Sequence, residues 1–294
     1  MTKKLFRIFR KLKIPYNFSK KLIHYNNFIF NYANITTYII GGGKTDNTNI
    51  DIKKEKIKFK DYTFIILSYY EEGDYIIKLE TKDKIICFLI ILSSLVDYAY
   101  INNISNYKDC SCEGNLPSNG GGKILLKFVI NYLIQNKNIF KFKINKIVLQ
   151  DNSYITCKKI NIPLSDLYFL THGDTWYGQF NFRPFDSLNN IPDKNNIKLY
   201  ENYKNIINQI KLKDYIKIYD LIIKADKKLN INHIDENKFK KIILKNENML
   251  LKDFLNKLLK DKYPMCLIFN EIKTKIMSDL NIKSFHTNSF YLNI

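Results

Sequence analysis

Apolar residues between positions 62 and 104 fall into four short runs that predict a β-meander. Polar turns separate the runs, and connections this short favour antiparallel pairing of neighbouring strands. The expected strands cover residues 62–70, 74–80, 84–92 and 96–104. The longest apolar run, Ile85–Val96, has 12 residues, which is too short to span a bilayer, so we expect a buried strand and no transmembrane segment.

Helical spacing of apolar residues begins in the segment 123–137. The apolar positions recur at i, i+1, i+4 and i+5 and form one stripe of Ile124, Leu125, Phe128, Val129, Tyr132 and Leu133. A strand at 144–149 follows, so the order strand–helix–strand predicts a crossover connection and a parallel pair. A short helix at 164–170 and a strand or helix-to-strand corner at 176–182 come next.

The last third of the chain has helical patterns almost throughout. We expect helices within 200–228, 236–246 and 248–262, a short edge strand at 290–292, and loops at 45–60 and 186–197. Together the patterns predict an α/β fold with a mixed, mostly antiparallel sheet, a central helix and a C-terminal helical region. The expected parts are a basic helical segment 1–34, an α/β domain 35–185 and a mostly helical region 186–294, which is either a separate domain or an insertion before the last strand.

The first fifty residues carry two weaker patterns. Residues 1–13 are basic and amphipathic but lack the apolar core of a secretory signal, which favours a helix with a solvated basic face over a membrane-surface or mitochondrial-type role. The short strand expected at 35–40 leads into Gly41-Gly42-Gly43-Lys44-Thr45, which resembles the end of a phosphate-binding P-loop. Tyr38 stands where that motif needs its first Gly, so we do not expect a P-loop.

The composition favours a folded protein, since 46% of the 294 residues are hydrophobic. The five Cys are odd in number and their spacing gives no disulfide framework, so we expect reduced thiols in an intracellular, cytoplasmic-type compartment. Neither a CxxC motif nor a closely spaced His pair is present, so we expect no metal site.

The formal net charge of +19 raises the question of nucleic-acid binding. Of the 47 basic residues 44 are Lys and only three are Arg, whereas nucleic-acid binders rely on Arg for bidentate contacts. Lys, Asn and Ile all have A/T-rich codons, and their abundance is typical of A/T-rich genomes, including viral ones. The charge therefore indicates genome composition more than a nucleic-acid partner, and a virion is the alternative location.

A glycine turn, Gly120-Gly121-Gly122, leads directly into the helix expected at 123–137. Glycine permits positive φ and a close approach of ligand to backbone. The first N–H groups of a helix lack intrahelical acceptors and lie at the positive end of the macrodipole, where a pyrophosphate fits. Lys123 adds a positive charge at the same place.

The order of these features resembles the GNAT superfamily of acyl-CoA-dependent N-acetyltransferases. Pro117-Ser118-Asn119-Gly120-Gly121-Gly122 supplies both glycines of that family's Q/R-x-x-G-x-G/A pattern without its leading Gln or Arg. Tyr177-Gly178-Gln179-Phe180-Asn181-Phe182 is similar to the family's fYxxxGF motif, with Asn181 in place of Gly, and Asn tolerates the left-handed conformation. The stretch YAYINNIS looks like the family's cofactor-lining strand, and the resemblance covers about residues 35–185.

The resemblance implies that the cofactor is acetyl-CoA. Backbone amides near the end of the strand 98–104 would hold the pantetheine arm, and the glycine turn would hold the pyrophosphate. The residues expected to bind the cofactor are Ile101, Ile104, Gly120, Gly121, Gly122 and Lys123.

The resemblance also implies an N-acetyltransferase, which moves an acetyl group to an amine of a protein or small molecule. Tyr177 stands where the family often places the Tyr that protonates the leaving thiolate. Asp97, at the start of the strand 98–104, would act as the general base through water. The segment His172-Gly173-Asp174 has no accompanying nucleophile motif, so we expect a turn there.

Two alternatives come from other classes of function. The missing Gln or Arg, the replaced motif glycine and the long helical region favour a catalytically inactive GNAT-like structural or interaction protein. Abundant Lys and Tyr would suit a basic nucleic-acid-binding module, although no recognised motif accompanies them.

Overall fold

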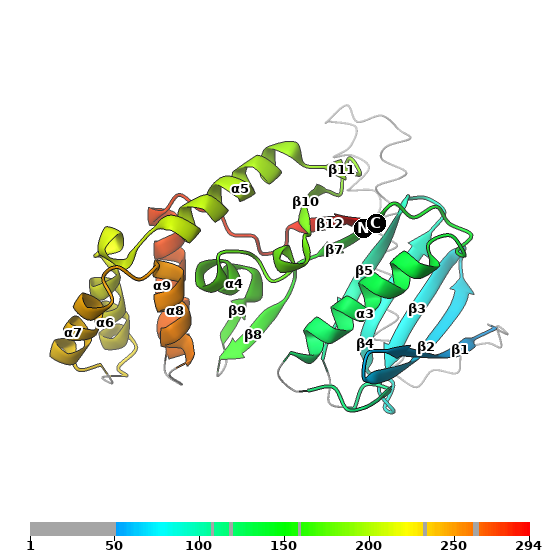
Figure 1. Ribbon diagram of the computed structural model, residues 1–294, viewed down its shortest axis with the longest axis horizontal. Helices are drawn as coiled ribbons and strands as arrows, with labels where there is room; N and C mark the ends of the chain where they lie inside the picture. Colours follow the sequence, from blue (N-terminus) through cyan, green and yellow to red (C-terminus); the bar gives the residue numbers. More distant parts are fainter. Residues whose placement is uncertain (1–50, 107–108, 118–119, 158–159, 232–233, 261–264) are drawn as a thin grey trace, which may run out of the picture. The chain divides into compact units, whose positions relative to one another are not determined.

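The structure is a computed structural model that describes residues 51–294 except for five short gaps (Figure 1). The gaps are 107–108, 118–119, 158–159, 232–233 and 261–264. Residues 51–294 form one compact unit. The basic segment 1–34, the strand expected at 35–40 and the P-loop-like sequence 41–45 all lie outside the described residues.

An antiparallel meander forms the first part of the sheet and confirms the four predicted strands. It consists of β1 (Lys53–Phe59), β2 (Tyr62–Glu71), β3 (Asp74–Glu80), β4 (Ile86–Ser93) and β5 (Tyr98–Ile104). The strand β1 was predicted as a loop because its sequence KKEKIKF is mostly polar. That prediction is wrong, because β1 pairs with β2 along its whole length. Two apolar residues, Ile57 and Phe59, are enough to pack this strand against the hydrophobic core.

The crossover helix α3 (Gly121–Asn136) connects β5 to β7 (Lys146–Gln150), and these two strands are parallel, as predicted. Figure 1 shows α3 lying across the meander. The apolar stripe of α3 is buried in the core that it shares with the meander strands. Phe128 stacks on Phe64 with ring centroids 4.2 Å apart and also meets Phe59 and Phe88. The core of the sheet therefore fixes where α3 begins.

The last strand lies inside the sheet instead of at its edge. β12 (Ser289–Asn293) pairs with β7 on one side and with β10 (Arg183–Asp186) on the other. Phe290 of β12 is fully buried, with 0% exposure. The edge position predicted for this strand is wrong, because sequence shows that a segment is extended but not which neighbours it meets. Residues 193–288 thus leave the sheet after β11 (Ile191–Pro192), which pairs with β10, and return to it at β12.

Most of the segment between those strands is helical, as predicted. Its helices are α5 (Lys194–Gln209), α6 (Ile218–Lys228), α7 (Glu236–Lys245), α8 (Leu251–Lys260) and α9 (Met265–Asp279). The helical segment expected at 200–228 holds α5 and α6, which a 3-10 turn, η2 (Leu212–Tyr215), separates, because Ile210 is extended and Asp214 accepts a hydrogen bond from the backbone of Lys211. The pattern also failed to predict α9.

Before this helical part the chain forms a short hairpin and helix beside the sheet. The hairpin pairs β8 (Tyr154–Cys157) with β9 (Ile160–Pro163), and α4 (Leu164–His172) follows directly. A 3-10 turn, η1 (Gly178–Phe180), then leads to β10, which is the predicted helix-to-strand corner. Two short strands, β6 (Cys112–Glu113) and β11 (Ile191–Pro192), pair with β2 and β10.

Among the residues described, each helix is too short or too polar to cross a bilayer. The apolar run 85–96 instead contributes the buried strand β4, as the sequence analysis expected.

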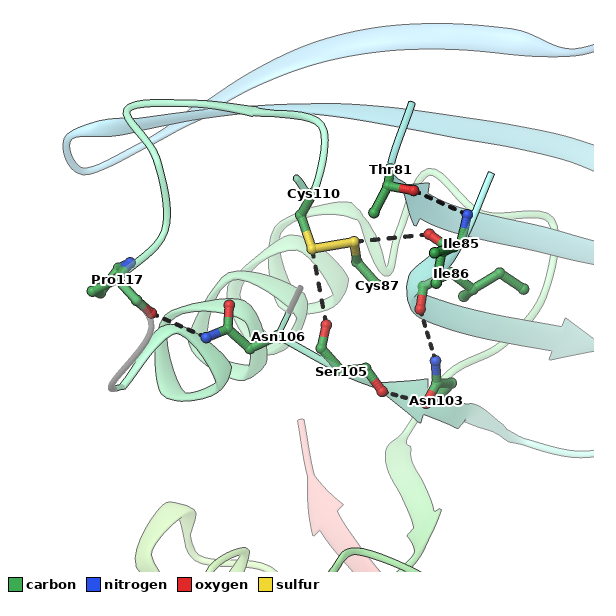
Figure 2. Close-up of a disulfide and its surroundings, with 9 residues drawn as sticks. All are labelled: Thr81, Ile85, Ile86, Cys87, Asn103, Ser105, Asn106, Cys110 and Pro117. Atoms are coloured by element: carbon green, nitrogen blue, oxygen red, sulfur yellow. Dashed lines mark hydrogen bonds between the residues drawn. A yellow bond between two sulfur atoms is a disulfide. The ribbon is translucent and has the colours of Figure 1, made fainter. Parts of the chain in front are cut away.

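Two disulfides correct the prediction of unpaired thiols. Cys87 pairs with Cys110, and Cys157 pairs with Cys266, whereas Cys112 is free. The partners are 23 and 109 residues apart in sequence, so only the fold brings them together. The first disulfide ties the loop after β5 to β4 (Figure 2).

Candidate functional site at the carboxyl end of the parallel pair

The parallel strands β5 and β7 stop pairing before β5 ends. Their register runs from Tyr98 opposite Lys146 to Ile101 opposite Leu149. Beyond that point β5 continues to Ile104 alongside β4, with Asn102 as the extra residue of a bulge, while β7 continues alongside β12. The carboxyl ends of parallel strands are where open α/β sheets usually bind ligands.

The glycine turn before α3 lies at this end of the pair. Gly120 has φ of +90° and caps α3 in the left-handed conformation, which only glycine adopts at little cost. A β-carbon at Gly121 would run into the side chain of Asn106, the second residue after β5. Asn106 itself donates to the carbonyl oxygen of Pro117 at 3.0 Å, as Figure 2 shows. Both glycines are therefore required by the geometry of the turn.

The positive end of α3 has no neutralising cap among the residues that the structure describes. No side-chain hydrogen bond caps it at Gly120, and its first turn carries no acidic residue. Among its first N–H groups, that of Gly121 donates to Pro117 O at 3.2 Å, and those of Lys123 and Ile124 donate to Gly120 O. An anion at this helix end would therefore compete with Pro117 for the N–H of Gly121.

Aromatic and basic side chains surround the start of α3. Trp176 lies 3.7 Å from the position that a β-carbon of Gly122 would take. The Nζ of Lys123 lies 3.4 Å from Oε1 of Gln179 and 5.9 Å from the ring centroid of Tyr168. The predicted cofactor residues Gly120, Gly121, Gly122 and Lys123 are thus brought together with the motif that contains Tyr177.

Tyr177 is almost completely buried, with 7% exposure. Its ring meets that of Trp176 edge to face, with centroids 4.8 Å apart. Burial raises the pKa of Tyr177 far above its usual value, and the nearby Asp151 and Tyr100 raise the pKa further. Asn181, in the same motif, has φ of +66°, which confirms the left-handed conformation predicted for it.

Asp151, which sequence analysis did not single out, lies in the same neighbourhood. It is the first residue after β7 and is fully buried, with 0% exposure. Its Oδ1 accepts hydrogen bonds from the backbone N–H of Ser153 at 3.0 Å and from the Ser153 hydroxyl. Its Oδ2 has no hydrogen-bond partner among the described residues. The feature of the sequence that could have indicated Asp151 is a carboxylate placed directly after a buried parallel strand.

The pKa of Asp151 is raised, and burial is the main cause. The charge of Asp166 on α4 acts in the same direction. Hydrogen bonds from Ser153 and the proximity of His286 oppose the shift without cancelling it. A buried carboxylate with a shifted pKa is typical of functional sites.

Asp97 lies at the other end of β5. Its Oδ1 is 3.1 Å from Nζ of Lys146, and Asn145 donates to its Oδ2 at 3.3 Å. Partial burial acts to raise the pKa of Asp97, but the hydrogen bonds from Lys146 and Asn145 and the charge of Lys146 outweigh it and lower the pKa. With seven residues in β5, the two strand ends are about 20 Å apart, so Asp97 is not brought together with Tyr177.

The two predicted isoleucines of β5 contribute their backbone to the site. The side chain of Ile101 is buried in the core and cannot contact a ligand. Ile104 is half-buried and lies opposite Phe88 of β4. Their main-chain groups flank the point where β5 and β7 separate.

The predicted turn His172-Gly173-Asp174 is confirmed at the end of α4. Gly173 caps the helix with φ of +76°, and His172 stacks on Tyr168 with ring centroids 4.4 Å apart. Within the described residues no group of three or more His, Cys, Asp or Glu could hold a metal ion.

Comparisons of the chain with known protein families, curated proteins and solved structures find no match.

Proposed function

We propose that the protein is an acetyl-CoA-dependent N-acetyltransferase of the GNAT type. The observation that carries the proposal is a convergence at the carboxyl ends of β5 and β7. The uncapped start of α3, the end of strand pairing and the motif containing Tyr177 all meet there. The sequence resemblance requires these same three features in one place.

The strand order supports the proposal as well. The segment 193–288 leaves and rejoins a single sheet, since β12 pairs with both β7 and β10 and β11 pairs with β10. The helical region is therefore an addition before a last strand, which is one of the two arrangements compatible with the resemblance. The resulting α/β unit keeps the crossover helix and parallel pair that would bind the cofactor.

Acetyl-CoA would bind with its pyrophosphate at the start of α3. The helix dipole and the ammonium of Lys123 would stabilise the negative charge, and the N–H of Gly121 would exchange Pro117 for a phosphate oxygen. The pantetheine amides would pair with the backbone of β5 beyond Ile101, where pairing to β7 has ended. The thioester would then lie toward Tyr177, the member of the motif that faces the strand ends.

The reaction needs an acid at the leaving sulfur. The amine lone pair attacks the thioester carbonyl carbon, a C–N bond forms and the C–S bond breaks. Tyr177 donates its O–H proton to the departing thiolate, the new amide nitrogen loses one proton to solvent, and Tyr177 recovers a proton from solvent, so the protons balance over a cycle. The products are an amide and free coenzyme A thiol.

Thermal unfolding with acetyl-CoA tests the cofactor assignment, with ATP as the control for simple polyphosphate binding. Ligand at about 100 times its Kd adds roughly 2.7 kcal/mol to stability. For a domain of this size we expect a rise in Tm of roughly 2–4 °C per kcal/mol. A shift with acetyl-CoA but not with ATP supports the proposal, whereas equal shifts contradict it.

The second candidate is a GNAT-like scaffold without activity. Two observations favour it: the side chain of Asn106 already fills the space beside Gly121, and Tyr177 is buried. A scaffold of this kind predicts no shift with either ligand, so the same measurement distinguishes the two candidates.

A further inference from the structure

The turn 173–178, which carries Tyr177, is held by the helical region that the resemblance does not account for. Three polar side chains of α5, those of Tyr200, Lys204 and Asn208, lie four residues apart and therefore share one face of the helix. Each of them forms a polar contact with the first part of the turn. We call these three residues the polar stripe of α5.

Tyr200 makes the central contact. It is 1% exposed, and its hydroxyl donates to Oδ1 of Asp174. Because that proton is committed to Asp174, the hydroxyl of Thr175, 3.2 Å away, donates to the Tyr200 oxygen. Oγ1 of Thr175 in turn accepts from the backbone N–H of Gly178 at 2.9 Å. A chain of hydrogen bonds therefore runs from α5 to the peptide group that follows Tyr177.

The other two residues of the polar stripe hold the start of the same turn. Nζ of Lys204 lies 2.8 Å from Oδ2 of Asp174, so α5 binds both carboxylate oxygens of this residue. Asn208 donates to the carbonyl oxygen of Gly173 at 2.9 Å. The polar stripe thus contacts three successive residues of the turn, 173–175, just before the chain reaches Tyr177.

Two glycines of the turn show how closely α5 approaches it. A β-carbon at Gly173 would collide with the amide group of Asn208, and one at Gly178 would collide with the Tyr200 hydroxyl and with Asp174. Gly178 lies in η1 without a positive φ, so close packing and not backbone conformation requires glycine there. Packing this tight leaves the turn little room to move.

We propose that the polar stripe of α5 positions Tyr177 for the transfer step, which makes the added helical region part of the catalytic site. The inference rests on the proposed acetyltransferase function. Tyr200, Lys204 and Asn208 are positioning residues, since they contact the turn and not the reacting atoms. Proton transfer needs the Tyr177 hydroxyl within hydrogen-bond reach of the leaving sulfur, and a displacement of about 1 Å can cost about 10²-fold in rate.

The turn contains its own probe, because Trp176, next to Tyr177, is the only Trp among the 294 residues. Its half-buried ring meets the rings of Tyr177 and Phe180, with centroids 4.8 and 5.5 Å apart. Acrylamide quenching of Trp fluorescence therefore reports how tightly the turn is held, independently of any catalytic activity.

The test compares Tyr200→Phe with the wild type in Trp176 quenching and in thiol release from acetyl-CoA, with n-butylamine as acceptor. The variant keeps the ring and loses the hydrogen bonds to Asp174 and Thr175. We expect kcat to fall by about 10–10²-fold and KM for acetyl-CoA to stay within about twofold, because the glycine turn is untouched. Quenching of Trp176 should increase.

Tyr203→Phe is the matched control, because Tyr203 is also a buried tyrosine of α5 but packs its ring against Phe285. It should keep wild-type kcat and quenching. A second pair of variants covers the case in which Tyr200→Phe does not fold. Lys204→Met removes the ion pair with Asp174 at a partly exposed position and should lower kcat, whereas Lys204→Arg keeps the pair and should restore kcat.

Each outcome decides the proposal. If either kcat or Trp176 quenching of Tyr200→Phe matches the wild type, the positioning role is overturned. A raised KM with unchanged kcat also overturns it, since Tyr200 would then support cofactor binding alone. Equal losses in Lys204→Met and Lys204→Arg, or a loss in Tyr203→Phe, would indicate general damage to α5 and contradict the proposal.

Failure of the proposed function gives a different result. A wild type whose Tm does not respond to acetyl-CoA removes that function itself, and a wild type that binds acetyl-CoA without releasing thiol favours the scaffold. Both results overturn the catalytic role of the polar stripe. Neither alters the comparison of Trp176 quenching, so failure of the function is distinguishable from failure of the positioning alone.

Discussion

The two ends of the β5–β7 pair each carry an aspartate in contrasting surroundings. At the amino end Asp97 forms an ion pair with Lys146 and accepts from Asn145, and its pKa is lowered. At the carboxyl end Asp151 is fully buried with one oxygen unpaired among the described residues, and its pKa is raised. The first arrangement contributes to the stability of the fold, whereas the second reduces it.

This contrast indicates where to look for function. A satisfied, partly exposed ion pair adds a little stability and needs no further explanation. A buried carboxylate with an unsatisfied oxygen persists despite its cost, which is common where chemistry requires a shifted pKa. The glycine turn and the buried Tyr177 lie at the same end as the costly residue.

The largest expected effect on stability comes from the disulfide at the carboxyl end. Cys87 lies on β4, where its carbonyl oxygen accepts from Ser105 at 2.7 Å, and Cys110 lies in the loop that leads to the glycine turn. We expect Cys87→Ser with Cys110→Ser to lower the free energy of unfolding by about 2–5 kcal/mol and to abolish the Tm shift with acetyl-CoA. Denaturant unfolding and the thermal shift measure the two effects.

The second disulfide provides the matched control. Cys157→Ser with Cys266→Ser removes a link between β8 and the start of α9. We expect a similar loss of stability with the acetyl-CoA shift retained. If both double variants lose the Tm shift with acetyl-CoA, binding at the carboxyl end does not depend specifically on the disulfide between Cys87 and Cys110.

A smaller effect is expected at the glycine turn, where two neighbouring residues can be compared. A β-carbon at Gly121 meets the side chain of Asn106, so Gly121→Ala should cost about 1–3 kcal/mol and weaken acetyl-CoA binding. At Gly122 the nearest atom would be 3.7 Å away on Trp176, an ordinary contact, so Gly122→Ala should change stability by less than about 0.5 kcal/mol. Equal costs at both positions would contradict the described turn.

The aspartate at the carboxyl end gives the third effect, on the pH dependence of stability. Because the folded-state pKa of Asp151 is raised, its stabilising contribution is present at low pH and is lost as pH rises through that pKa. Asp151→Asn removes this loss. We expect it to be more stable than the wild type by about 1 kcal/mol at pH 8, with the difference shrinking toward pH 5. A variant that is less stable at every pH would contradict the account.

The smallest effect is expected at the amino end. The folded-state pKa of Asp97 is lowered, so its contribution is present above the ordinary Asp pKa and is lost as pH falls through the lowered value. For a partly exposed pair we expect Asp97→Asn to cost about 0.2–1 kcal/mol at pH 7 and nothing in strong acid. A loss of turnover by about 10²-fold or more in Asp97→Asn would restore the sequence-based prediction that Asp97 is the base.

Sequence alone predicted the parts of the fold that depend on local pattern. The meander, the stripe of α3 and the left-handed Asn181 follow from alternation, helical spacing and backbone preference. Placing β12 between β7 and β10, and pairing Cys157 with Cys266, required contacts between residues far apart in the chain. Such contacts leave no local signal.

The candidate site was predictable to the same extent. The glycine turn and the Tyr177 motif were found because each is a contiguous sequence. Asp151 was not, because its distinguishing properties are complete burial and a raised pKa, which only the fold creates. Asp97 was selected for its position at the start of a predicted strand, and the direction of β5 then placed it at the far end from the turn.

Amide hydrogen exchange with and without saturating acetyl-CoA tests the central claim most directly, because it reports on both ends of the parallel pair at once. The account predicts new protection at residues 101–106 and 120–124, no change around Asp97 and Lys146, and no such pattern with ATP. Protection confined to the amino end, or the same pattern with ATP, would contradict the assignment of an acetyl-CoA site to the carboxyl ends of β5 and β7.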